Sequence, residues 1–109
     1  MPGRINDVLN EFEKELRELL GTVLVKVILF GSYARGDYNK ESDIDVMVLI
    51  NVPSEQVSHY ADRVYDIAYD IEQIYDIELN PCIQSADIYD YWKCVHPFFM
   101  TIEREGVVV

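Results

Sequence analysis

The chain has 109 residues, half of them hydrophobic, and a formal net charge of −11 from 9 basic and 20 acidic residues. This length suits a single domain, residues 1–109, with a sizeable hydrophobic core. The negative charge argues against direct binding of nucleic acid, because proteins that bind phosphate backbones need a basic surface. It suits a basic protein partner, although charge of this kind also serves solubility alone.

Several features are typical of a protein of the reducing cytoplasm. No stretch approaches the ~20 apolar residues of a membrane span. The first ten residues, with Arg4 and Asp7, show no signal-peptide pattern. The two cysteines, Cys82 and Cys94, make neither a disulfide framework nor a zinc pattern. We therefore expect a cytoplasmic protein in which both cysteines are small core residues.

The first half of the chain predicts a helix followed by two strands. Apolar residues at helical spacing indicate a helix that ends at Gly21. They are Ile5, Val8, Leu9, Phe12, Leu16, Leu19 and Leu20. Residues 23–30 and 44–50 are apolar and rich in β-branched side chains, as buried strands are. The polar residues 36–42 form the loop between these strands.

The next element is a long helix that starts at Pro53 and Ser54. Its expected apolar stripe is Val57, Tyr60, Ala61, Val64, Ile67, Ala68, Ile71, Ile74 and Tyr75. The face away from this stripe sets tyrosines among carboxylates. It comprises Asp62, Tyr65, Asp66, Tyr69, Asp70 and Gln73. Such a face suits an interface with a basic protein, and an ordinary solvated face is the alternative.

A third strand is expected at about residues 77–84, with Ile77, Leu79 and Ile83 facing one side and Glu78, Asn80 and Cys82 the other. Pro81 lacks an N–H, which indicates an edge strand or a bulge. Two helices follow, one capped by Ser85 and running through Trp92, the other from Pro97 to Gly106. Residues 107–109 could add to the sheet. The aromatic residues Trp92, Phe98 and Phe99 are expected in the core, and His59 and His96 in structural or surface positions.

The most informative stretch is FGSYARGDYNKESDIDVMVLI, residues 30–50. Gly31 lets the chain turn sharply at the end of a strand and lets a phosphate approach the backbone. Ser32 offers a hydroxyl group. Its N–H and those of Tyr33 and Ala34 lie at an expected helix start, which favours anion binding. The turn therefore predicts a phosphate site.

Asp43 and Asp45 open the next strand, and alternation along a strand points both to one face. Two carboxylates so close together repel each other unless a cation lies between them. They also lead directly into the buried residues 46–50, where an unpaired charge costs free energy. Mg²⁺ is a hard ion that takes a few carboxylates plus phosphate oxygens, so the pair predicts a magnesium site.

A third acid would help to fix two metal ions around a phosphoryl or nucleotidyl transfer. Glu78 is the best candidate because it alternates with apolar neighbours on the third strand. Asp76 and Asp87 are the alternatives. Arg35 could pair either with a phosphate or with the acids themselves. We include Arg35 and Ser42 in the expected nucleotide-binding set.

Gly31-Ser32 followed, ten residues on, by Asp43-Ile44-Asp45 resembles the signature of the DNA polymerase beta nucleotidyltransferase superfamily. The string GSYARGDYNKESDIDVMV is similar to its small prokaryotic branch, the minimal nucleotidyltransferases. The resemblance covers nearly the whole chain. It implies an α/β (α+β) nucleotidyltransferase fold, a small mixed sheet flanked by helices in the order α-β-β-α-β-α-α.

By this resemblance Gly31 and Ser32 contact the phosphates of a nucleoside triphosphate, with ATP as substrate. Asp43 and Asp45 bind Mg²⁺, expected as two ions. Glu78 matches the third-carboxylate position, as Glu where Asp is usual and in a strand interrupted by Pro81.

Many minimal nucleotidyltransferases are antitoxins paired with HEPN ribonuclease toxins, and transfer AMP from ATP to a tyrosine of the toxin. The resemblance therefore implies an antitoxin that adenylylates a HEPN partner. Two alternatives remain open. One is a non-catalytic binding module that neutralises the toxin by direct contact. The other is a transferase acting on a small molecule or an RNA end, and the net charge disfavours RNA.

Overall fold

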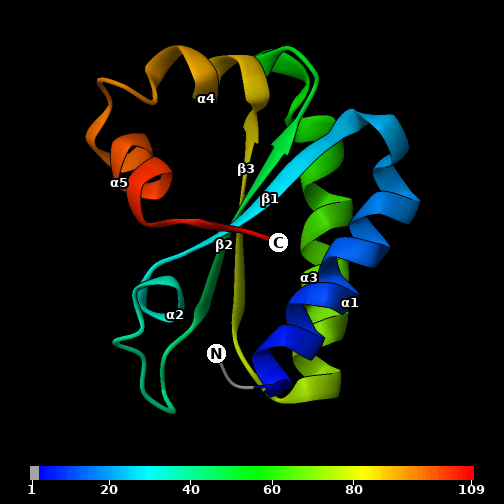
Figure 1. Ribbon diagram of the computed structural model, residues 1–109. Helices are drawn as coiled ribbons and strands as arrows, with labels where there is room; N and C mark the ends of the chain where they lie inside the picture. Colours follow the sequence, from blue (N-terminus) through cyan, green and yellow to red (C-terminus); the bar gives the residue numbers. More distant parts are fainter. Residues whose placement is uncertain (1–2) are drawn as a thin grey trace.

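The computed structural model describes residues 3–109, which form a mixed four-stranded sheet flanked by helices (Figure 1). Its elements are α1 (Gly3–Leu20), β1 (Leu24–Phe30), α2 (Ser32–Arg35), β2 (Ile44–Ile50), α3 (Ser58–Tyr75), β3 (Leu79–Ser85), α4 (Ala86–Trp92), α5 (Pro97–Glu105) and β4 (Val107–Val108). Short 3₁₀ turns occupy Gly21–Val23 and Ser54–Gln56. The predicted fold class and element order are confirmed, with the short α2 added. The long helix begins at Ser58, four residues later than expected.

The strands lie in the order β3-β2-β1-β4. β1 runs antiparallel to β2 and to β4, and β2 runs parallel to β3. Pro81 therefore lies on an edge strand, where its missing N–H breaks no ladder on the open side. The C-terminal tail joins the sheet as predicted, since Val108 pairs with Ile28.

One face of the sheet is covered along its whole length by the two long helices. In Figure 1, α1 and α3 stand together on one side of the sheet. Alternate strand residues such as Leu29, Val46 and Val48 meet buried helix residues such as Phe12 and Ile71 there. All of these side chains are at most 1% exposed in the folded chain. This cluster is the main core, and the apolar stripes of α1 and α3 produce it.

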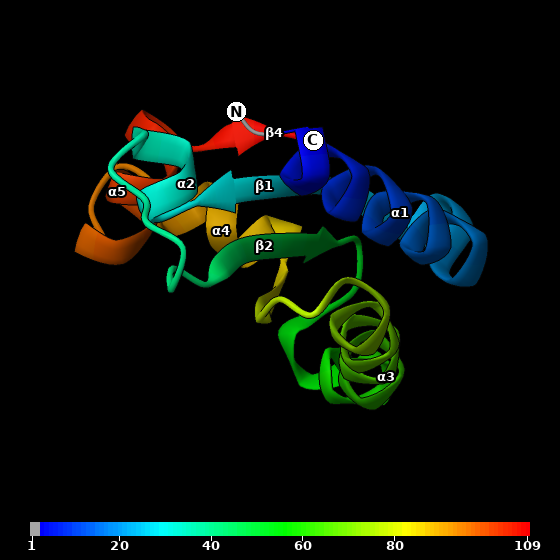
Figure 2. The ribbon, with the colours of Figure 1, turned by 90° about the horizontal axis from the view of Figure 1, so that it is seen from below.

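The opposite face carries a smaller core under α4 and α5. Met47, Leu49 and Ile28 pack there against buried residues of the two helices. The hydroxyl group of Tyr89 on α4 donates a hydrogen bond to Glu103 on α5 at 2.8 Å. In Figure 2, seen from below, α5 lies on the side of the sheet away from α3, and Figure 1 shows α4 near one end of the strands and α2 near the other. The short helices cover only part of the face.

Several burial predictions are wrong. Ile74 is 72% exposed, because buried Ile71 and half-buried Tyr75 make the core contacts of the last turns of α3. Trp92 and Phe98 are also exposed: α5 turns Phe99 toward the core, and the adjacent Phe98 packs beside the rings of Phe30 and Phe99 at the surface.

Both cysteines are free thiols, and only Cys82 packs against the smaller core, whereas Cys94 is exposed. His59 and His96 are exposed, as expected. Ser85 precedes α4 but makes no capping hydrogen bond through its side chain. None of the helices in the described part of the chain is both long and apolar enough to span a bilayer.

Candidate functional site

The turn after β1 is built around Gly31. Its φ of 76° and ψ of −156° are accessible to glycine and strained for other residues. The Gly31 carbonyl accepts hydrogen bonds from the N–H groups of Ala34 and Arg35, both at 3.1 Å. The Ala34 N–H is therefore used inside the turn, and it drops out of the predicted anion-binding set. Ser32 stays at the start of α2, as expected.

Gly31 also lies directly against Asp45. A Cβ atom added at Gly31 would lie 2.5 Å from the Asp45 carboxylate oxygen Oδ2, which is far inside van der Waals contact. The predicted phosphate turn and the predicted metal-binding acid are therefore in contact. The β1–β2 register explains this, because Phe30 pairs with Asp45.

The register of β2 and β3 brings the acids of the two strands together. Asp45 pairs with Asn80, and the Ile44 N–H donates to the carbonyl of Glu78 at 2.9 Å. Alternation sets Asp43, Asp45, Glu78 and Asn80 on the face that carries Met47 and the smaller core. The Asn80 side-chain amide donates a hydrogen bond to Asp43 at 3.2 Å.

Asp45 and Glu78 both have raised pKa values, and the charge of Asp43 contributes to each. Burial raises the pKa of Asp45 and the charge of Asp43 adds to this, while a hydrogen bond from Asn80 lowers it. The pKa of Glu78 is raised by a hydrogen bond and by repulsion between its carboxyl group and that of Asp43. A bound cation would reverse both effects, because it favours the charged carboxylates.

The donor set suits a hard cation. Within residues 3–109, no three His, Cys, Asp or Glu side chains are already arranged as a metal cluster. The close carboxylates nonetheless offer only oxygen ligands, and Mg²⁺ is commonly held by one or two carboxylates together with water and substrate phosphates. The residues therefore fit Mg²⁺ as a partner of a phosphate substrate.

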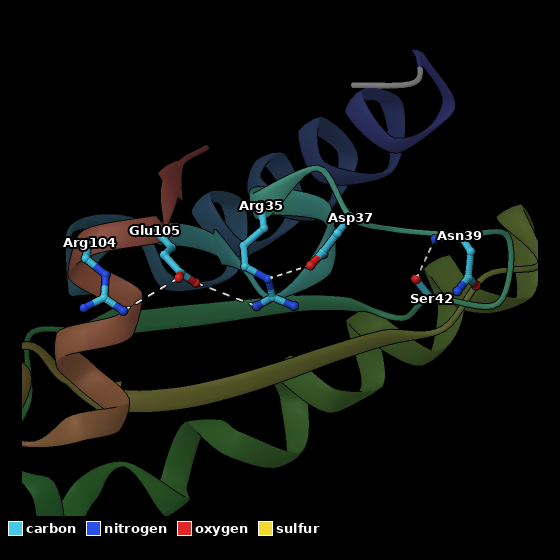
Figure 3. A network of polar contacts seen from close by, with 6 residues as sticks. All are labelled: Arg35, Asp37, Asn39, Ser42, Arg104 and Glu105. Atoms are coloured by element: carbon cyan, nitrogen blue, oxygen red, sulfur yellow. Dashed lines mark hydrogen bonds and ion pairs between the residues drawn. The ribbon is translucent and has the colours of Figure 1, made fainter.

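The Arg35 side chain is directed toward Asp37 and Glu105 (Figure 3). Its Nε lies 3.1 Å from Asp37 Oδ2, and its Nη1 lies 3.7 Å from Glu105 Oε2 on α5. The expectation that Arg35 could pair with Asp43 or Asp45 is thus wrong for this structure, although its charge still lowers the pKa of Asp45. Contact with a phosphate stays a prediction.

Ser42 closes the loop that precedes β2. Its hydroxyl oxygen accepts a hydrogen bond from the Asn39 N–H at 2.9 Å, and Asn39 Oδ1 accepts one from the Glu41 N–H at 2.8 Å. Figure 3 shows this contact well apart from the Arg35 network. Ser42 thus has a structural role, and its binding of nucleotide stays a prediction.

A cavity of about 760 Å³ opens beside the acids. It is lined by Arg4, Ile5, Tyr33, Tyr38, Asn39, Lys40, Glu41, Ser42, Asp43, Glu72, Gln73, Asp76, Ile77 and Glu78. Gly31, Ser32 and Asp45 do not line it. This acid-lined cavity therefore meets the acids at Asp43 and Glu78, and it adjoins the phosphate turn at Tyr33.

The structure also ranks the candidates for the third acid. Glu78 is beside Asp43, and Asp76 lines the cavity at the end of α3. Asp87 lies on α4, beyond the opposite end of β3, about 20 Å along a seven-residue strand. Asp87 is therefore excluded as a partner of Asp43.

Sequence reasoning missed Asn80, which contacts Asp43 and lowers the pKa of Asp45. The alternation that identified Glu78 sets Asn80 on the same face, two residues further on. Its contact with the acids depends on the parallel pairing of β2 with β3, which the sequence did not specify.

Similarity to known proteins establishes the family of this chain. The chain belongs to the family described as nucleotidyltransferase domain, whose model matches residues 9–99. A Methanocaldococcus jannaschii protein named "Putative protein adenylyltransferase MJ0141" is 39% identical over 96% of this chain and 98% of its own length. A second protein of that organism, "Putative protein adenylyltransferase MJ0604", is 32% identical over 93% of both chains.

Solved structures share the fold. A structure described as a minimal nucleotidyltransferase is 20% identical, covers 94% of this chain and 92% of its own, and has a TM-score of 0.53. A crystal structure of a toxin-antitoxin with AMP-PNP is 19% identical, covers 91% of this chain and 69% of its own, and has a TM-score of 0.56. The resemblance to minimal nucleotidyltransferases is confirmed, and at these identities the structural likeness concerns the fold.

Proposed function

We propose that this nucleotidyltransferase transfers AMP from ATP to the hydroxyl group of a tyrosine in a partner protein, and that it acts as an antitoxin toward a HEPN-type toxin. The observation that carries the proposal is the contact of the Gly31 turn with Asp45, beside Asp43 and Glu78. This contact sets a turn suited to phosphate binding directly beside carboxylates suited to Mg²⁺. The names of the two Methanocaldococcus relatives support a protein acceptor.

The residues divide the work of the transfer. The Gly31-Ser32 turn holds the β- and γ-phosphates, and Asp43 and Asp45 would hold Mg²⁺. Bound Mg²⁺ would neutralise charge on the phosphates and on the leaving group. The acceptor oxygen attacks the α-phosphorus, the bond from that phosphorus to pyrophosphate breaks, and an AMP ester forms. Glu78, which lies beside Asp43, takes the hydroxyl proton.

The direct test is transfer of label from ATP carrying ³²P at the α-phosphate. The purified chain is incubated with Mg²⁺ and the protein encoded beside it. We expect Mg²⁺-dependent labelling of that protein, lost in the Asp43→Asn, Asp45→Asn variant. The matched control is Glu18→Gln, Glu55→Gln, two exposed acids that lie outside both the site and the acidic tyrosine face of α3, so it removes the same charge elsewhere. Equal labelling by both variants would refute the proposed activity.

A second candidate is an antitoxin that acts by contact alone. The acidic tyrosine face of α3 favours it, since Tyr65 and Tyr69 are 48% and 60% exposed among carboxylates. In that case the Asp43→Asn, Asp45→Asn variant would still protect cells. Charge reversal by Asp66→Lys and Asp70→Lys would abolish protection. The opposite pattern supports catalysis.

A further inference from the structure

We infer that the acid-lined cavity binds the acceptor: a peptide segment whose aromatic hydroxyl residue is flanked by basic residues. This inference rests on the proposed transfer to a protein and assigns the acceptor side of that site. The cavity adjoins the phosphate turn at Tyr33 and extends beyond it, because Asp43 and Glu78 line it and Gly31, Ser32 and Asp45 do not.

The direction of the reaction supports this assignment. In phosphoryl-type transfer the attacking and leaving oxygens lie roughly in line through the phosphorus atom. The leaving pyrophosphate would lie at the Gly31 turn, with the α-phosphate at the acids. The attacking hydroxyl must then arrive from the other side of the acids. The cavity is lined by Asp43 and Glu78, so it offers the hydroxyl group an approach to the acids.

The cavity wall offers an aromatic surface. The rings of Tyr33 and Tyr38 stack with centroids 4.7 Å apart and an interplanar angle of 18°. Tyr33 is 8% exposed and fixed in the core, whereas Tyr38 is 38% exposed. The buried ring therefore holds the outer ring in place, and an incoming aromatic side chain can pack on it at little entropic cost.

The acidic lining of the cavity favours basic residues on either side of the acceptor residue in the peptide. Five acidic residues line the cavity, and only two basic ones do, Arg4 and Lys40. Arg4 already donates to the Asp76 carbonyl at 3.3 Å. A triphosphate is disfavoured in such surroundings, while Lys and Arg are favoured. The volume of about 760 Å³ exceeds the needs of one side chain and suits a short segment.

Gln73 connects the cavity to the acidic tyrosine face of α3. It lines the cavity and belongs to that face, one turn beyond Tyr69. A partner protein bound to this face of α3 could therefore insert an acceptor segment into the cavity while it remains bound. The two features form one continuous acidic path.

The test uses three synthetic pentapeptides with ATP and Mg²⁺: tyrosine between pairs of arginines, tyrosine between pairs of glutamates, and phenylalanine between pairs of arginines. We expect AMP on the first peptide only, or with a KM at least about tenfold below that of the acidic peptide. No labelling of the basic peptide, or equal KM values for the two tyrosine peptides, would overturn the inference.

Cavity variants locate the peptide. Gln73→Arg and Tyr38→Ala should raise the peptide KM about tenfold, and Gln73→Glu should lower it. All three should leave AMP-PNP affinity within about twofold of the wild type, because they lie away from the phosphate turn. Tyr65→Ala, outside the cavity, is the control. Weaker AMP-PNP binding with an unchanged peptide KM would instead make this a nucleoside site.

The two proposals fail differently. If the partner protein is labelled with Mg²⁺ and ATP but the Gln73 variants do not affect labelling, the cavity assignment is wrong and the proposed function stands. If neither peptide nor partner accepts AMP from the wild type, the proposed function itself is wrong.

Discussion

The two faces of β2 differ sharply along one seven-residue strand. Toward α1 and α3, the alternate residues from Ile44 to Ile50 are all fully buried. Toward α4 and α5, Met47 and Leu49 are equally buried, but Asp45 remains partly exposed. The long helices have 18 residues each, whereas α4 and α5 have 7 and 9. The length of the covering helices thus decides where the sheet can carry charge.

The open end of that face is where the acids lie. A carboxylate at the position of Met47 would be enclosed, and ionising it there would cost free energy. At Asp45 the same backbone leaves the carboxylate against the Gly31 turn and within reach of Asn80. The face under α1 and α3 therefore stabilises the fold, and the open end of the other face carries the acids of the proposed active site.

The largest expected change in stability comes from truncating the covered face. Phe12 on α1 is fully buried, whereas Phe98 on α5 is 42% exposed. Phe12→Ala should lower the free energy of unfolding by about 3–5 kcal/mol, from lost burial and a cavity. Phe98→Ala should lower it by at most about 1 kcal/mol, as partly exposed substitutions do. Urea unfolding measures both.

Phe12→Leu keeps this comparison measurable if Phe12→Ala does not fold. Phe12→Leu should lower the free energy of unfolding by less than Phe12→Ala does, and by more than Phe98→Leu does. Equal losses at the two positions would show that the two faces contribute alike, against the account above.

The next comparison, between alanine substitutions at Gly31 and Gly36, distinguishes the effect of backbone strain from the effect of contact with Asp45. Gly31 and Gly36 have similar positive φ values, 76° and 88°, but a Cβ at Gly36 meets nothing within 4 Å. Gly36→Ala should lose about 1–2 kcal/mol of stability from its left-handed backbone, and Gly31→Ala at least as much, because the Gly31 backbone is in a region nearly confined to glycine. Only Gly31→Ala should also displace Asp45 and abolish AMP transfer. Equal retention of activity would show that the close approach is dispensable.

A smaller effect concerns pH. Burial raises the pKa of folded Asp45 above its usual value. The stability linked to this group is therefore fully present below the unfolded pKa, about 4, and is lost as pH rises through the folded pKa. Asp45→Asn removes this loss, so its Tm should exceed that of the wild type by a few degrees at pH 7, with a smaller gain near pH 4.

Thermal unfolding across this pH range provides the measurement, with Asp66→Asn on exposed α3 as the control for removing one charge. A constant Tm difference between Asp45→Asn and the wild type from pH 4 to pH 7 would contradict the expected effect of burial.

The smallest change in stability is expected at Arg35. Its pairs with Asp37 and Glu105 are exposed, and exposed ion pairs contribute little. Arg35→Ala should leave the unfolding midpoint unchanged, and it should raise the KM for ATP several-fold if the guanidinium turns to a phosphate. Glu105→Gln removes one partner of Arg35 and is the control. An unchanged KM for ATP would remove Arg35 from the nucleotide-binding set.

Local patterns predicted much of this molecule. Alternation along the strand gave Asp43 and Asp45 a common face, and the missing N–H of Pro81 indicated the edge position of β3. The juxtaposition of Gly31 with Asp45 was only implied, because it depends on the β1–β2 register.

Features that depend on long-range packing were not predictable. Arg35 meets Glu105, 70 residues further along the chain. Phe98 and Phe99 are chemically alike, and the angle at which α5 packs decides which of them is buried. The contact of Asn80 with the acids was not predictable for the same reason, since the parallel pairing of β3 with β2 brings Asn80 to them.

Binding of AMP-PNP to the wild type and to the Asp43→Asn, Asp45→Asn variant, by calorimetry with Mg²⁺ and with EDTA, tests the central claim most directly. The claim is that the carboxylates at the open end of the sheet hold Mg²⁺ and a nucleoside triphosphate together. It predicts that Mg²⁺ tightens binding to the wild type at least about tenfold, through charge neutralisation, and leaves the variant unaffected. The same gain with Mg²⁺ in both proteins would contradict it.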